Sequence, residues 1–188
     1  MNLPFKTYKW IYWERFLEKI KRLPNTFLTK SPKITHRSCT VVRTNKHYKI
    51  YPGYKTEYGG RAGRPVYFLA LDCDANELAE NIRDCLQHSR YVPIKRAKGI
   101  IFDGRKDMLN HLKERSFKQL YRHPQCDIAL DQEEKQVYIY PMKRERYYLV
   151  FDEPEIISYK SENWMEDDMM NKVVSKILAC LDGLNPAT

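Results

Sequence analysis

The chain has 188 residues, of which 43% are hydrophobic and 30% are charged. This length and composition favour one folded domain, or one domain with an appended segment. No apolar run reaches the ~18 residues that a membrane-spanning helix needs, and charged residues interrupt the apolar N-terminus, which argues against a secretory signal. We therefore expect a cytoplasmic protein whose five cysteines are free thiols that pack as small hydrophobic side chains.

The net charge of +9 is unevenly distributed along the chain. Residues 1–125 contain 26 Lys and Arg against 11 Asp and Glu, whereas residues 126–188 contain 7 against 13. An excess of positive charge is typical of proteins that bind nucleic acids. The acidic C-terminal third would repel a phosphate backbone unless it folds away from the basic part.

An aromatic-rich amphipathic pattern over residues 5–23 predicts a helix that ends before Pro24. Its apolar positions recur at three- and four-residue steps: Trp10, Trp13, Leu17 and Ile20. Such a helix could lie on a membrane surface or pack on its own domain, and Glu14 and Glu18 favour packing because they dilute its basic face. We assign residues 1–35 to this helix and a linker, and residues 36–188 to an α/β domain.

Two β-hairpins are predicted in similar sequence settings. The first runs from Cys39-Thr-Val-Val through a polar turn to Tyr48-Lys-Ile-Tyr-Pro52. The second runs from Cys126-Asp-Ile-Ala-Leu through an acidic turn to Val137-Tyr-Ile-Tyr-Pro141. Each is followed by a further apolar strand, near residues 66–71 and 147–151, and later by a helix. The pattern predicts an internal ββ(β)α pseudo-repeat.

The two helices that close these halves carry clear start and stop signals. Asp74 is a favourable N-cap with Glu77 three residues later, and acidic residues 167 and 168 lie in the first turn of a helix over 165–181, which Gly183 ends. Residues 105–120 predict one helix or two short ones between the halves. Amphipathic strands and helices of this kind indicate an α+β (mixed α/β) fold, with helices packed on a mainly antiparallel sheet.

No motif in the sequence indicates catalysis or a metal site. The five histidines fall in separate predicted elements, and no HExxH or GxSxG motif occurs. The stretch Gly59-Gly60-Arg61-Ala62-Gly63 lacks the Lys-Ser/Thr ending of a phosphate-binding loop. The carboxylates of the C-terminal third follow no calcium-loop register. We predict a binding protein that is not an enzyme and needs no cofactor or metal.

Single-stranded RNA is one candidate partner. Four tyrosines in the basic part alternate with lysines and arginines, which is the combination that holds single strands by stacking and charge. These tyrosines are Tyr48, Tyr51, Tyr54 and Tyr58. Tyrosine is also common in strands for reasons of packing alone, and no RNA-recognition signature accompanies the four residues.

The order of motifs resembles the immunity proteins of bacterial contact-dependent growth-inhibition (CDI) systems. The resemblance covers residues 39–181: a strand with Asn45-Lys46-x-Tyr48-x-Ile50, a Gly-containing loop, a strand ending Leu71-Asp72, an acid-capped helix with Glu77-Leu78-Ala79 that closes on Ser89-Arg90, a second hairpin and a C-terminal helix. It implies a protein that binds the toxin domain delivered by a neighbouring cell, one to one, and occludes its active site in the cytosol.

The resemblance transfers no residue role by motif, so the toxin-binding residues are predicted from residue type. Interfaces depend on aromatic and Arg anchors and on complementary charge. We expect exposed anchors in the Gly-rich loop and in the acidic tail: Tyr54, Tyr58, Arg61, Arg64, Glu153, Glu155, Glu162, Trp164 and Glu166. Residues 1–35 and the strong positive charge depart from the family pattern, so either the acidic third meets a basic toxin or the basic part meets an acidic one.

Overall fold

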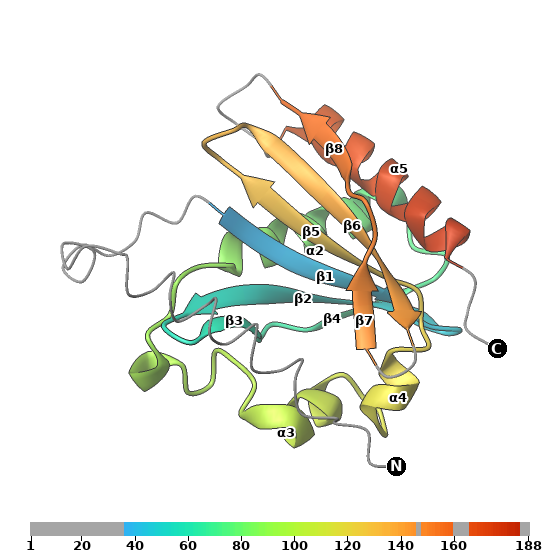
Figure 1. Cartoon of the computed structure of the whole chain (residues 1–188). Helices are drawn as coiled ribbons and strands as arrows, with labels where there is room; N and C mark the ends of the chain where they lie inside the picture. Colours follow the sequence, from blue (N-terminus) through green and yellow to red (C-terminus); the bar gives the residue numbers. More distant parts are fainter. Residues whose placement is uncertain (1–35, 146–147, 160–165, 185–188) are drawn as a thin grey trace, which may run out of the picture. The chain divides into compact units, whose positions relative to one another are not determined.

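The computed structural model describes residues 36–145, 148–159 and 166–184 (Figure 1). The predicted helix over 5–23, the assignment of 1–35 as a separate segment, and the candidate residues Glu162 and Trp164 lie outside the described residues.

The eight described strands form one antiparallel sheet, in the order β3-β2-β1-β5-β6-β7. The first four strands are β1 (His36–Arg43), β2 (His47–Thr56), β3 (Gly59–Ala62) and β4 (Tyr67–Ala70). The last four are β5 (Gln125–Asp131), β6 (Gln136–Glu145), β7 (Tyr148–Phe151) and β8 (Glu155–Ser158). The long strands β2 and β6 each pair with two short strands in succession, β4 and β3 along β2, and β8 and β7 along β6.

This arrangement confirms the predicted pseudo-repeat. Cys39 pairs with Pro52 in the first hairpin, and Cys126 pairs with Pro141 in the second. The two halves meet where β1 and β5 run antiparallel, and Thr40 pairs with Asp127 next to the central pair of that ladder. The Thr40 hydroxyl donates a hydrogen bond of 2.9 Å to the Asp127 carboxylate. A local two-fold axis therefore passes between these two residues.

Helices α2 (Ala75–His88) and α5 (Asp167–Gly183) lie on one face of the sheet (Figure 1). The backbone amide of Glu77 donates to the Asp74 carboxylate at 2.7 Å, so the predicted N-cap is confirmed. Both helices turn their apolar stripes onto the strands. The resulting core includes Ile50, Ile82, Ile128, Ile139 and Ile177, each of which is fully buried.

The other face of the sheet is covered over its first half by residues 89–124, which connect α2 to β5. This connection contains η2 (Ile94–Arg96), α3 (Gly104–His111) and α4 (Phe117–Leu120), so two short helices form where residues 105–120 predicted them. Leu112 and Leu120 pack on Val42 and Tyr51 in a second apolar cluster. The connection between the repeats thus supplies the covering layer of this face.

None of the described helices combines the length and hydropathy needed to cross a membrane. All five cysteines are free, and Cys39, Cys85 and Cys126 are buried. Burial raises the pKa of these three thiols. They therefore pack as neutral side chains, as the sequence predicts.

Candidate functional site

The connection over residues 89–124 contacts the β2–β3 hairpin along both of its edges. Where the pairing of β2 with β1 stops, Tyr91 forms a parallel β-bridge with Lys55 of β2. Lys55 N donates to Arg90 O (3.1 Å), and Val92 N donates to Lys55 O (2.8 Å). On the other side, Phe102 N donates to Ala62 O (3.1 Å). The chain therefore wraps around the hairpin, and backbone hydrogen bonds fix it there.

Gly63 permits this close approach. A Cβ atom at this position would lie 2.4 Å from the Ile100 carbonyl oxygen and 2.6 Å from the Tyr54 ring. In the same place, Arg64 N donates to the Ile100 carbonyl at 2.8 Å. Only glycine fits between the hairpin and the connection without displacing one of them.

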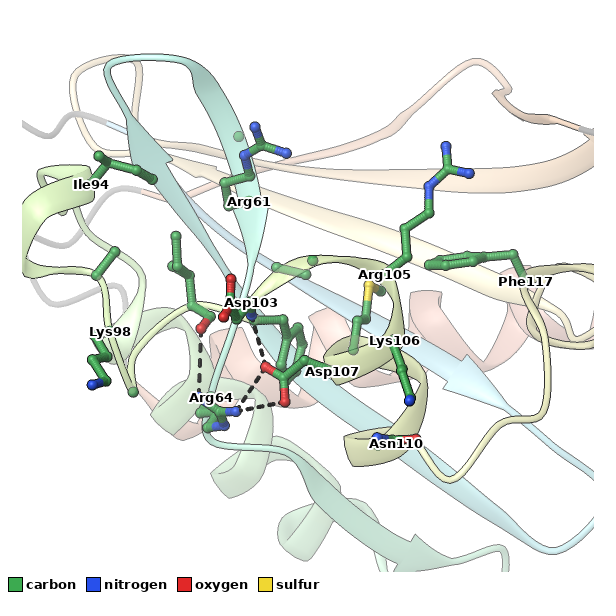
Figure 2. A pocket seen from close by; sticks show the side chains of 18 residues that line it. Arg61, Arg64, Ile94, Lys98, Asp103, Arg105, Lys106, Asp107, Asn110 and Phe117 are labelled. Atoms are coloured by element: carbon green, nitrogen blue, oxygen red, sulfur yellow. Dashed lines mark hydrogen bonds and ion pairs between the residues drawn. The ribbon is translucent and has the colours of Figure 1, made fainter.

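Between the hairpin and the connection lies a pocket of about 1180 Å³ (Figure 2). Its wall comes from β3, from the loop that follows η2, and from α3, and Phe117 closes one end. Five cationic side chains line it: Arg61, Arg64, Lys98, Arg105 and Lys106. Its carboxylates are Asp103 and Asp107. Cations therefore outnumber carboxylates, and the pocket attracts anionic groups.

Arg64 is held in the pocket wall by contacts with α3 and with Phe102. Its guanidinium donates to both carboxylate oxygens of Asp107 (3.1 and 2.9 Å), and its Nε donates to His111 Nε2 (3.1 Å). It also lies over the Phe102 ring, 5.5 Å from the centroid. The backbone amide of Asp103 donates to Asp107 at 2.8 Å, and this bond, with the nearby Arg64 and His111, lowers the pKa of Asp107. The Asp107 carboxylate therefore stays ionised and holds Arg64 against α3.

The other four cations are not used in this way. Within the described residues, no carboxylate lies at ion-pair distance from Arg61, Lys98, Arg105 or Lys106. The Arg105 guanidinium instead lies over the Phe117 ring, 5.8 Å from the centroid. Arg61 and Arg105 extend away from the Arg64–Asp107 pair (Figure 2). No carboxylate of the described part of the chain would therefore compete with a partner for these four side chains.

The four anchors predicted in the Gly-rich loop differ in exposure. Arg61 is exposed in the pocket wall, Arg64 is half-buried in its ion pair, and Tyr58 is 75% exposed at the hairpin turn. The expectation of an exposed Tyr54 is wrong, because that side chain is 2% exposed. The connection packs Val92, Ala97 and Ile101 on it, and its hydroxyl donates to the Arg64 carbonyl at 2.5 Å.

The same burial removes the stacking platforms proposed for RNA. Tyr48 and Tyr51 are 6% and 5% exposed, and Tyr54 is covered as well. Among the four tyrosines of the basic stretch, Tyr58 alone presents its ring to solvent. The alternation of tyrosine and lysine along β2 therefore reflects burial of the strand on both faces.

The acidic candidates lie at the opposite edge of the sheet. Glu153 is exposed between β7 and β8, Glu155 pairs with Lys176 of α5 (3.1 Å), and Glu166 immediately precedes α5. Five strand spacings separate β3 from β7, or roughly 24 Å. The predicted interface is therefore two surfaces, and the structure does not bring them together.

Most residues of the pocket belong to no sequence motif. Lys98, Arg105, Lys106 and Asp107 lie between the two halves, where the sequence predicts helices and no site. A local charge count would have found it, because residues 90–124 contain ten Lys and Arg against three Asp and Glu. In the part of the chain that the structure describes, no cluster of three or more His, Cys, Asp and Glu side chains could hold a metal ion.

Comparison with known proteins identifies the fold. No family model matches the sequence, and no curated protein matches it. A protein of unknown function from Neisseria meningitidis has a similar structure, with a TM-score of 0.59, 14% identity, and coverage of 84% of this chain and 100% of that one. A chain of a CdiA-CT/CdiI toxin and immunity complex from Yersinia pseudotuberculosis is also similar, with a TM-score of 0.54, 13% identity, and coverage of 80% of this chain and 98% of that one. The described residues thus adopt a fold that also occurs in a toxin and immunity complex.

Proposed function

We propose that this chain is an immunity protein that binds a cognate toxin domain one to one in the cytoplasm and occludes its active site. It acts by binding alone and needs no cofactor. The toxin would cover a patch of standard size, ~800 Å² on each partner. The pocket, Tyr58 and the exposed Ile94 at the pocket rim form the binding surface.

The observation that carries this proposal is the position of the pocket in the pseudo-repeat. The local two-fold axis relates the first hairpin and α2 to the second hairpin and α5. Residues 89–124 have no described counterpart in the second half. This segment forms the pocket and leaves four cations without described ion-pair partners. A rigid repeated platform with one elaborated, charged connection fits a protein that recognises a specific partner. The similarity to a chain of a toxin and immunity complex supports the same function.

The surface combines features of a protein interface. Ile94 is 38% exposed, and its backbone amide is held by the Glu57 carboxylate (3.0 and 3.2 Å), so the apolar rim is fixed in place. Tyr58 supplies an exposed aromatic ring at the hairpin turn. Aromatic and Arg anchors carry most of the affinity in protein interfaces, and here Tyr58 and Arg side chains without described ion-pair partners stand beside the apolar Ile94. Binding of single-stranded RNA has less support, because three of its four expected stacking rings are buried.

The test is reconstitution with the toxin domain encoded next to the gene for this chain. We expect size-exclusion chromatography with light scattering to show a 1:1 complex, and toxin activity to fall to zero at one equivalent of this protein. Tyr58→Ala and Ile94→Asp should each weaken the complex by about 1–2 kcal/mol, or roughly tenfold.

Two variants provide controls for these substitutions. Leu71→Asp alters a side chain that is 40% exposed, close to the 38% of Ile94, but lies outside the pocket. Glu153→Lys alters the acidic edge of the sheet. Both should bind with unchanged affinity. A toxin that remains active and unbound at excess wild-type protein would refute the proposal, and loss of binding in Glu153→Lys alone would move the interface to the acidic edge.

A further inference from the structure

The charge of the pocket defines what its partner must present. Arg61, Lys98, Arg105 and Lys106 surround one hollow, and Asp103 is the one lining carboxylate that is not engaged by Arg64. Like charges gathered around a concave surface repel one another and attract anions. Binding of an anionic group would therefore be favoured both by direct attraction and by relief of this repulsion.

Two features favour carboxylates of a protein over phosphates of a nucleic acid. The Phe102 and Phe117 rings already carry Arg64 and Arg105 on their faces, so no base can stack there without displacing an arginine. The exposed Ile94 at the rim offers an apolar contact that an acidic polypeptide can use and a phosphodiester cannot.

We infer that the pocket receives an acidic segment of the partner protein, in which Asp or Glu carboxylates bind Arg61, Lys98 and Arg105 and an adjacent apolar side chain packs on Ile94. This inference names the chemistry of the site described above, so in the cell it depends on the proposed function. The toxin surface should then carry an acidic patch, and the basic part of this chain should be the part that recognises it. Arg64 positions the pocket wall and is not itself a ligand.

The first experiment does not require the toxin. Three glycines of the wall (Gly60, Gly99 and Gly104) give backbone amide signals that report on the pocket by NMR. The probes are a synthetic peptide of Asp and Glu with one Leu, and a single-stranded oligoribonucleotide of the same charge. We expect the peptide to shift these three signals, and Arg105→Glu to abolish the shifts. Tighter binding of the oligoribonucleotide than of the peptide would overturn the inference.

The second experiment uses the toxin complex and separates the two proposals. Arg61→Glu, Lys98→Glu and Arg105→Glu should each weaken binding roughly tenfold and reduce its dependence on salt. Lys172→Glu makes the same charge change on an exposed residue of α5, across the sheet from the pocket, and should leave binding within twofold of wild type. A complex that forms normally with all three pocket variants would overturn the acidic-segment inference and leave the immunity function standing. If the wild-type protein does not bind the toxin but the peptide still shifts the glycine signals, the immunity function is refuted. The inference that the pocket binds acidic segments would then still stand.

Discussion

A buried ion pair fastens the pocket-bearing connection to the sheet, and its removal should destabilise the protein strongly. Lys49 of β2 and Glu114, which follows α3, contact each other through Nζ and Oε1, and each side chain is 2% exposed. The Lys49 ammonium also donates to the Leu112 carbonyl at 2.6 Å. The second carboxylate oxygen of Glu114 is buried and has no hydrogen-bond partner within the described residues.

Lys49→Met would leave the Glu114 charge buried and without its cation. Removal of one partner of a buried pair costs about 3–5 kcal/mol, which is a large part of the ~5–15 kcal/mol by which domains are stable. Replacement of both partners, in Lys49→Met with Glu114→Leu, should cost far less than the sum of the single changes. Urea denaturation followed by circular dichroism measures these free energies in a double-mutant cycle. Single changes that each cost less than about 1 kcal/mol and add without coupling would refute this account of the pair.

Two further predictions concern the centre of the sheet and the hairpin. Burial raises the pKa of Asp127 to about 6 from 3.8, and its hydrogen bond with the Thr40 hydroxyl opposes the rise only partly. The folded protein then holds this proton more tightly than the unfolded chain, so stability falls as pH rises from about 4 to about 6. Asp127→Asn should raise the free energy of unfolding by about 3 kcal/mol at pH 8 and change it little at pH 4, and an equal effect at both pH values in urea denaturation would contradict this. Gly63→Ala should cost about 1–3 kcal/mol, because its Cβ would lie 2.4 Å from the Ile100 carbonyl. Thermal denaturation followed by circular dichroism measures this cost. Gly60→Ala, whose Cβ meets nothing within 4 Å, should be neutral in that assay, and equal melting temperatures for the two variants would show that the close approach is not needed.

Local signals in the sequence predict the repeated framework well. Asp74 and Glu77 mark the start of α2 because capping depends on residues only three apart. The Cys-to-Pro hairpins predict the two halves because alternation specifies which side chains share a face. The axis through Thr40 and Asp127 follows once both hairpins place equivalent strands at the centre.

The site itself depends on contacts between residues far apart in the chain. Tyr54 is buried by Val92, Ala97 and Ile101, about 40 positions later, and alternation along β2 carries no information about that cover. Lys49 looks like an outward-facing strand residue until the connection over residues 89–124 buries it against Glu114. Such long-range cover explains why tyrosines that alternate with lysines predict a binding surface that the folded chain does not present.

The most direct test of the central claim is survival of cells that express the neighbouring toxin domain together with this protein. Wild-type protein should restore growth, and the variant that combines Arg61→Glu with Arg105→Glu should fold normally by circular dichroism yet fail to protect. Cells that die despite abundant wild-type protein would contradict the immunity function. Cells that the double variant protects fully would contradict the assignment of the pocket as the surface that meets the toxin.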